Sequence, residues 1–152
     1  MSSVSQMSIP ERIEAAWVGR NPTVIGRLSS GWLVLCDDQF FRGYCLLLAD
    51  PIVPDLNALG PDSQVEFLAD MAKVGQALLE VTGAARINYA ILGNSDPFLH
   101  AHIIPRYADE PDEYRLNSPW SYPSEMRESR PFDQARDQEL MERIAANLRS
   151  KG

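Results

Sequence analysis

The stretch "DPFLHAHIIPRY", residues 96–107, decides how this 152-residue chain folds, and it holds both histidines, His100 and His102. Apolar residues alternate with the two imidazoles, and successive side chains of a β-strand point to opposite faces. The pattern therefore predicts a strand over residues 99–104. Phe98, His100 and His102 lie on one face of it, and apolar side chains lie on the other.

Apolar runs upstream predict four further strands. They lie at residues 23–28, 32–36, 44–49 and 86–92. The links between the first three strands are too short for parallel crossovers, so we expect an antiparallel sheet. The predicted fold class is α+β, with a five-stranded antiparallel sheet, one long helix, and N- and C-terminal helices.

Capping and terminating residues mark the three helices. They are Ser8 and Gly19 for the first, Asp62 or Ser63 and then Gly83 for the long helix over residues 62–81, and Asp133 for the last. Residues 108–131 are acidic and Pro-rich, which indicates either an ordered surface arm or a flexible tail. We interpret residues 1–152 as a single domain. Its core spans about residues 20–107, and residues 108–152 form the arm and the C-terminal helix.

Composition excludes some classes of function. The formal net charge of −7 argues against binding a nucleic-acid polymer or an anionic membrane, because such surfaces need an excess of Lys and Arg. Cys36 and Cys45 sit inside apolar runs, which is typical of buried free thiols. The N-terminus lacks the basic start and apolar core of a signal peptide, and no apolar run has the length of a membrane span. We therefore expect a cytoplasmic protein.

The histidine pair by itself supports three interpretations. Each imidazole can be a structural residue whose nitrogens are hydrogen-bonded. The two can form half of a zinc or iron site, because His-x-His on a strand is common in such sites. They can also form a covalent catalyst, because neutral imidazole attacks phosphorus directly. A metal site needs further ligands, and the sequence has no third histidine to supply one.

The residues around the histidine pair resemble the sequence of a known protein family. "INYAILGNSDPFLHAHIIPRY", residues 87–107, resembles the signature region of the histidine triad (HIT) family of nucleotide hydrolases and transferases. "LVLCDDQFFRGYCLLLADPIVPDLNAL", residues 33–59, is similar to the nucleotide-facing strand, loop and second strand of that family. "SPWSYP", residues 118–123, resembles an extension found in some bacterial members.

The resemblance implies an activity. It is attack on the α-phosphate of nucleotides such as dinucleoside polyphosphates, through a nucleotidyl-histidine intermediate. It also implies a homodimer with a small-molecule nucleotide as ligand. No cofactor and no metal is required, although magnesium can accompany a polyphosphate substrate.

The resemblance also implies roles for individual residues. His100 matches the nucleophile, and His102 matches the histidine that hydrogen-bonds the phosphate and helps the leaving group. Asn94 matches the amide residue that binds the phosphate chain. Ser95 can donate to phosphate or can serve only the turn.

For several other residues, more than one role stays open. Asp37 matches the residue that holds the ribose hydroxyls, with Asp38 as the competing assignment. Arg106 can steer anions, but we interpret it as a solvated residue at the strand end. Trp120 and Tyr122 either dock on their own subunit or reach the pocket of a partner.

Two positions depart from the family pattern. Phe98 stands where the triad has its first histidine, and Pro51 stands where many members have a further one. The pair predicts an apolar backing behind His100. It also leaves two alternatives to the enzyme, namely a nucleotide-binding or sensing protein with weakened catalysis and a metalloprotein that uses His100 and His102.

Overall fold

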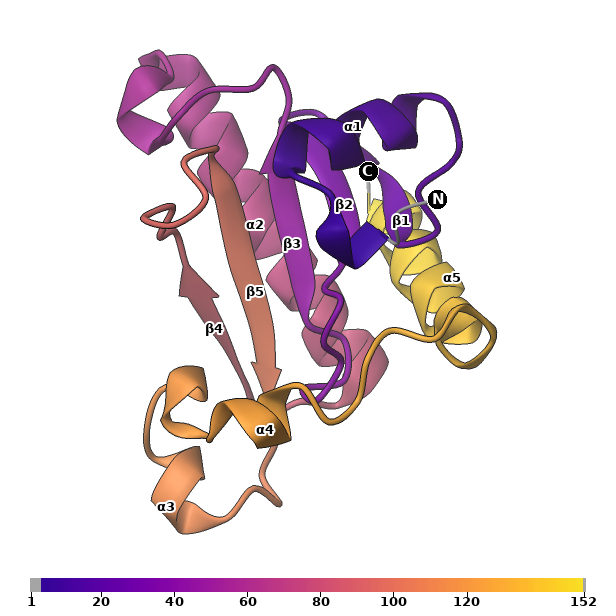
Figure 1. The fold of residues 1–152 in the computed structure, drawn as a ribbon, viewed down its shortest axis with the longest axis vertical. Helices are drawn as coiled ribbons and strands as arrows, with labels where there is room; N and C mark the ends of the chain where they lie inside the picture. The colour runs from indigo at the N-terminus through magenta and orange to yellow at the C-terminus, as the bar shows by residue number, and fades with distance from the viewer. Residues whose placement is uncertain (1–3, 152) are drawn as a thin grey trace.

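One antiparallel sheet organises the molecule, which a computed structural model describes for residues 4–151. Its strands lie side by side in the order β1-β2-β3-β5-β4 (Figure 1). Their bounds are Val24–Leu28 (β1), Gly31–Leu35 (β2), Cys45–Ala49 (β3), Arg86–Ala90 (β4) and His100–Arg106 (β5). The five-stranded antiparallel sheet of an α+β fold is therefore confirmed.

The ends of the last two strands differ from expectation. β4 stops two residues before the predicted end, and β5 continues two residues beyond it. Pro105 and Arg106 remain in the sheet because they lie opposite Ile87 and Arg86, so pairing with β4 carries the strand onward. The register between strands, which local pattern does not encode, sets these ends.

The helices lie on both faces of the sheet. Their bounds are Ile9–Trp17 (α1), Pro61–Thr82 (α2), Asp112–Arg115 (α3), Ser124–Arg127 (α4) and Gln134–Lys151 (α5), with 3-10 turns at Val4–Gln6 (η1), Leu56–Ala58 (η2) and Pro119–Ser121 (η3). α2 and α5 cover the back of the sheet in the view of Figure 1. α1 packs on the opposite face, and α3 and α4 lie at the lower end of that face. Within residues 4–151 no helix combines the length and apolar character needed to cross a bilayer.

The main core lies between the sheet and the two helices behind it. Leu99, Ala101 and Ile103 of the predicted strand are buried in this core with Phe67 of α2 and Ile144 of α5. The alternating apolar residues therefore face α2 and α5, and the side chains between them face the other way. This is the face assignment that the sequence predicts.

Helix starts follow local chemistry, with one correction. Ser8 caps α1 through a reciprocal capping box with Glu11, as predicted. Neither Asp62 nor Ser63 caps α2: its N-cap is Gly60, which provides no side-chain hydrogen bond. Proline is well tolerated in the first helical turn, so the helix begins one residue earlier, at Pro61.

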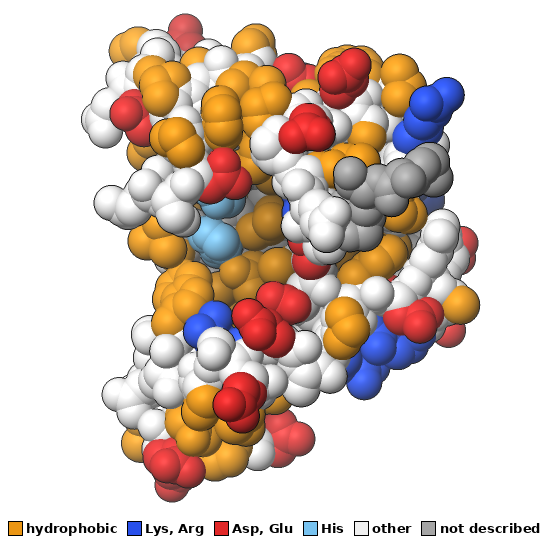
Figure 2. All heavy atoms as spheres, in the orientation of Figure 1, with side chains coloured by type: hydrophobic (Ala, Val, Ile, Leu, Met, Phe, Trp, Pro, Cys, Tyr) orange, Lys and Arg blue, Asp and Glu red, His pale blue; other side chains and the backbone are white. Residues whose placement is uncertain are grey.

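Residues 108–131 form an ordered arm on the front of the sheet. The Tyr122 side chain is buried against Phe41 and Ile104. Farther along, the Phe132 amide donates to the Asp37 carbonyl, and the chain then leads into α5. The arm and α1 leave a hollow between them, and Figure 2 shows the two histidines, pale blue, on its floor.

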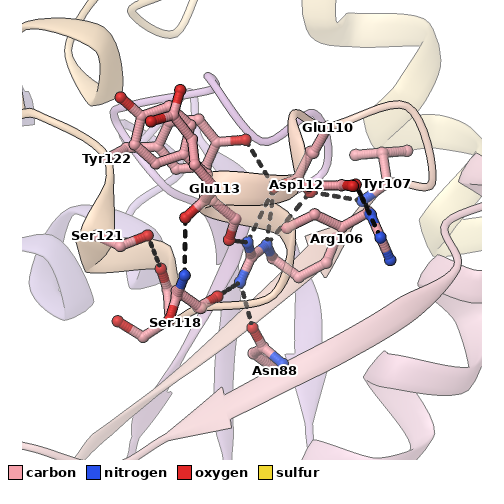
Figure 3. Close-up of polar contacts among 12 residues, drawn as sticks. Asn88, Arg106, Tyr107, Glu110, Asp112, Glu113, Ser118, Ser121 and Tyr122 are labelled. Carbon is pink, nitrogen blue, oxygen red and sulfur yellow. Dashed lines mark hydrogen bonds and ion pairs between the residues drawn. The ribbon is translucent and has the colours of Figure 1, made fainter.

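Arg106 anchors this arm, which corrects its interpretation as a solvated residue. Its side chain is 5% exposed. The guanidinium donates to both carboxylate oxygens of Glu110, to Asn88 Oδ1 and to the backbone carbonyls of Tyr114 and Asn117 (Figure 3). Every nitrogen of the guanidinium is engaged, so this side chain cannot reach an anion in solution.

Glu110 completes the anchor. Burial opposes its ionisation, but donors from Arg106, the Tyr107 amide and the Tyr122 hydroxyl outweigh burial and hold the pKa of Glu110 below its usual range. A carboxyl with a lowered pKa stabilises the fold above its unfolded pKa. This contribution disappears as pH falls through the lowered value.

We expect Arg106→Leu to destabilise the protein by about 3–5 kcal/mol, because it leaves the Glu110 carboxylate buried without its partner. The matched control is Arg115→Leu, which removes an exposed pair with Asp112 and should cost about 0–1 kcal/mol. Urea unfolding followed by circular dichroism measures both variants. Equal effects of the two variants would contradict the anchoring role of Arg106.

Candidate functional site

His100 and His102 lie on β5, a central strand between β3 and β4. His100 pairs across the sheet with Leu48, and His102 pairs with Leu46. Their ring centroids are 5.0 Å apart, with an angle of 61° between the ring planes. The pair therefore lies on a strand that is hydrogen-bonded on both sides, and it opens into the hollow of Figure 2.

The His100 ring is fixed by its own strand. His100 is 8% exposed, and its Nδ1 lies 2.7 Å from the carbonyl oxygen of Phe98. A carbonyl oxygen only accepts hydrogen bonds, so the proton of a neutral ring sits on Nδ1. The lone pair is then on Nε2, which has no hydrogen-bond partner within residues 4–151. This atom is not among the buried polar atoms that lack a partner, so it is open to the cavity side. This is the arrangement of an imidazole nucleophile.

His102 has a different partner. Its Nδ1 lies 2.6 Å from the hydroxyl oxygen of Tyr44. The ring also meets the edge of the Trp120 indole, with centroids 5.8 Å apart and planes at 87°. Burial, together with the charge of neighbouring His100, lowers the pKa of His102 to about 4. At neutral pH His102 is therefore an uncharged imidazole.

A cavity of about 440 Å³ opens over the two rings. Its lining residues are Leu92, Gly93, Asn94, Ser95, Asp96, His100, His102 and Trp120. The turn that follows β4 supplies five of these, and Gly93 adopts a φ of +81°, which favours glycine. The structure thus brings Asn94 and Ser95 to the histidine pair, as the sequence predicts.

Asp37 does not line this cavity. Its carboxylate accepts two hydrogen bonds from the Arg12 guanidinium, at 3.1 and 2.7 Å, which ties the end of β2 to α1. Asp38 lines a smaller neighbouring cavity of about 70 Å³, together with Tyr44 and Trp120. Neither carboxylate is brought into the cavity over the histidines, and a ribose-binding role for Asp37 stays a prediction.

The expected apolar backing is present only in part. Phe98 packs into the apolar cluster formed by Ile13 of α1 with Val34 and Leu48 of the sheet. Pro51, however, is exposed. The prediction of a joint Phe and Pro backing was therefore wrong for Pro51, because the segment after β3 runs outward to the surface.

Sequence reasoning missed Tyr44 and Asp96 as site residues and left the docking of Trp120 between two alternatives. Tyr44 is two residues before Leu46 and therefore shares the face of His102, but this follows only once the register of β3 against β5 is known. Trp120 reaches His102 from the arm, whose docking on its own subunit no local pattern encodes. Asp96 lines the cavity because it belongs to the same short turn as Asn94, and this proximity in sequence was a usable signal.

The donor set around the pair is small for a metal site. Among residues 4–151 no three His, Cys, Asp or Glu side chains gather closely enough to hold an ion. Zinc sites usually have three or four protein ligands. The chain's own contribution to any metal site here is therefore limited to the two imidazoles.

The fold has counterparts among solved structures. A histidine triad protein from Sinorhizobium meliloti superposes with a TM-score of 0.72 at 24% identity, covering 95% of this chain and 99% of that one. A hypothetical histidine triad nucleotide-binding protein from Sulfolobus tokodaii gives 0.70 at 14% identity, covering 92% of each chain. A zinc-bound histidine triad family protein from Mycobacterium smegmatis gives 0.66 at 20% identity, covering 97% and 99%.

Sequence comparison adds no closer link. No protein-family model matches the chain, and no curated protein matches it. At these identities the likeness to solved structures concerns the backbone arrangement. The chain therefore has the fold of the histidine triad proteins.

We expect the His102 ring to stay neutral through neutral and mildly acidic pH and to titrate near pH 4. The imidazole of the unfolded chain protonates around pH 6.5, so the unfolded state binds more protons between about 6.5 and 4. Stability should therefore decline as pH falls through that window. Titration of the ring resonances by NMR checks this, with His102→Gln assigning the signal. Protonation of His102 near pH 6.5 would contradict the burial argument.

Proposed function

We propose that this chain is a histidine triad nucleotide hydrolase or transferase that acts on the α-phosphate of nucleotides such as dinucleoside polyphosphates. One observation carries the proposal. His100 has its proton fixed on Nδ1 by the Phe98 carbonyl, and it shares one cavity with Asn94, Ser95 and His102. A nucleophile, amide and hydroxyl donors and a second imidazole thus converge on a space that fits a phosphate chain.

The reaction proceeds in two displacements. The Nε2 lone pair of His100 attacks the α-phosphorus and forms an N–P bond. The bond from phosphorus to the leaving group breaks, and the leaving group departs with the electron pair. Water then attacks the nucleotidyl-histidine, loses a proton and releases the mononucleotide, which regenerates His100.

Donors around the cavity stabilise the charge that develops on the phosphoryl oxygens. The side-chain amide of Asn94 and the hydroxyl of Ser95 line the same cavity as His102, which supports a role for all three as donors to these oxygens. Asp96 lines the same cavity and repels a phosphate, so it favours departure of the anionic product. Magnesium accompanies a polyphosphate substrate by binding the substrate's own oxygens and is not required by the chain.

Phe98 occupies the first position of the triad in this proposal. Its side chain packs against α1, while its carbonyl still accepts from His100. The nucleophile's orientation is therefore kept, and the loss of an imidazole retunes the rate more than the type of reaction. A nucleotide-binding or sensing protein with weak turnover is the alternative that this substitution supports.

We expect His100→Asn to abolish turnover while the fold is retained, because asparagine has no lone pair that can attack phosphorus. Intact-protein mass spectrometry after brief incubation with dinucleoside polyphosphates should show a nucleotidyl adduct on wild type and none on the variant. Full activity of His100→Asn would refute the mechanism. Tight nucleotide binding without turnover by wild type would favour the sensing alternative, and stoichiometric zinc or iron by elemental analysis would favour a metalloprotein.

A homodimer formed through the edge of the sheet belongs to the same proposal. β4 is an edge strand, and an unpaired strand edge invites pairing with another chain. Tyr89 on this strand is 46% exposed and packs over Gly75 of α2. Leu68 lies two turns before Gly75 on the same side of α2 and is also 46% exposed, with Val65 exposed beside it. These side chains form an apolar surface that a second copy would cover.

We expect light scattering to give twice the chain mass of 17.0 kDa for wild type. Leu68→Glu should shift the protein to a monomer, because it places a charge in the apolar surface beside β4. Val18→Glu is the matched control, since Val18 is also an exposed apolar residue but lies after α1. A monomeric wild type, or equal behaviour of the two variants, would contradict the interface.

The free thiols Cys36 and Cys45 suit a reducing compartment, and we expect the dimer in the cytoplasm.

A further inference from the structure

We propose that Tyr44 is a positioning residue that fixes the proton of His102 on Nε2, so that the site favours substrates whose leaving group departs as an anion. The two imidazoles then offer complementary groups to a substrate, namely a lone pair on His100 and an N–H donor on His102. The substrate class is a phosphoanhydride rather than a phosphoramidate. This inference rests on the proposed function for its substrate, whereas the tautomer follows from the contacts and burial of Tyr44 and His102 themselves.

The backbone places Tyr44 where its hydroxyl can reach His102. Leu46 lies directly opposite His102 across β3 and β5, and Tyr44 is two residues earlier on the same face. The diagonal neighbour of a strand pair is within reach of a long aromatic side chain. The ring centroids are 6.0 Å apart, and the hydroxyl oxygen lies 2.6 Å from Nδ1.

The direction of this hydrogen bond follows from the competing partners. Burial raises the pKa of Tyr44 far above its usual value, so the phenol keeps its proton. That proton can go to His102 Nδ1, 2.6 Å away, or toward the sulfur of Cys36, which also influences the pKa of the phenol. An imidazole nitrogen is a good acceptor and a thiol sulfur is a weak one. Tyr44 therefore donates to Nδ1, and the proton of His102 is on Nε2.

Cys36 reinforces this order. Burial raises the pKa of its thiol to about 12, so the sulfur keeps its hydrogen and can donate to the phenol oxygen. A bond donated by Tyr44 to Cys36 instead would leave the better acceptor, Nδ1, without a proton donor.

Among the remaining groups that face His102, His100 acts on it through charge and lowers its pKa. His100 and Trp120 meet the ring through their edges. Asp96 lines the cavity from the turn after β4, and Asp38 lies beyond Tyr44 in the neighbouring cavity with Arg127. No carboxylate within residues 4–151 hydrogen-bonds the ring, which agrees with a pKa of about 4 for His102.

A neutral imidazole held in this way donates a hydrogen bond but is a poor acid. To give up its Nε2 proton, His102 would have to take the phenol proton on Nδ1 and leave a buried tyrosinate. The raised pKa of Tyr44 opposes that transfer. His102 therefore stabilises a leaving oxygen by a hydrogen bond and does not protonate it.

This limit separates two kinds of substrate. A polyphosphate leaves as a weakly basic anion, so the P–O bond breaks with only a hydrogen bond to the departing oxygen. An amine leaving from a phosphoramidate must acquire a proton as the P–N bond breaks, because an amide anion is far too basic to depart. The site lacks a proton donor for that step, and the geometry therefore favours the anhydride.

The tautomer can be tested without any substrate. Long-range ¹H–¹⁵N correlation spectra of the full chain as purified distinguish Nε2–H from Nδ1–H imidazole. We expect wild-type His102 as the Nε2–H form and Tyr44→Phe as a mixture of tautomers. Tyr107→Phe is the matched control, because it removes a phenol hydroxyl that donates to the Arg42 carbonyl away from the cavity. A wild-type Nδ1–H ring, or no change in Tyr44→Phe, would overturn the positioning role.

The leaving-group preference is tested by kinetics. We compare kcat/KM for a dinucleoside polyphosphate and for a phosphoramidate that carries the same nucleoside. Wild type should favour the anhydride by about 10²-fold, the low end of the contribution of a general acid. Tyr44→Phe should reduce this ratio, because its freed Nδ1 can take up a proton, whereas Tyr107→Phe should leave it unchanged.

The possible failures are distinguishable. A wild type that prefers the phosphoramidate, or a ratio unaffected by Tyr44→Phe, overturns the leaving-group inference while the proposed function stands. Turnover of neither substrate overturns the proposed function together with the substrate class. The spectra of His102 still decide the role of Tyr44 in that case.

Discussion

Burial of one side of β5 is the constraint on which the rest of the structure depends. Leu99, Ala101 and Ile103 lie in the core against α2 and α5, so His100 and His102 must face the opposite hollow. A slip of one residue in the pairing would exchange the two sets and place imidazoles in an apolar core. The hydrophobic effect on one face of the strand thus fixes the chemistry on the other, without any direct contact between the two.

A second constraint acts at the far end of the same strand. Arg106 and Glu110 form a buried ion pair, and the guanidinium also satisfies the carbonyls of Tyr114 and Asn117. Burying two charges is costly unless each is fully hydrogen-bonded, so the pair requires the arm to fold in one way. That fold brings Trp120 against His102. The strand therefore presents the histidines and also organises the segment that encloses them.

The two histidines differ because their Nδ1 atoms meet different groups. The Phe98 carbonyl can only accept, whereas the Tyr44 hydroxyl has a proton to give. Two histidines that lie two residues apart on one strand therefore acquire opposite hydrogen-bonding roles from their partners. The side chain of Phe98 takes no part in this difference, because it is the backbone carbonyl at that position that orients the His100 ring.

The sequence by itself determined the elements and the face of the histidines. Strand alternation, the Ser8 cap and the Gly83 stop are local, because each depends on residues a few positions apart, and all were predicted. Asn94 and Ser95 could be placed at the site for the same reason, since a short turn joins them to β5.

Tertiary structure decided what depends on distant segments. Arg106 looked like a solvated residue because its five acceptors come from β4, eighteen residues back along the chain, and from the arm, up to eleven residues ahead. Tyr44 met His102 only through the register of two strands separated by α2. Asp37 pairs with Arg12 across 25 positions. Partners of this kind are chosen by packing of the whole chain, which no local pattern of residues contains.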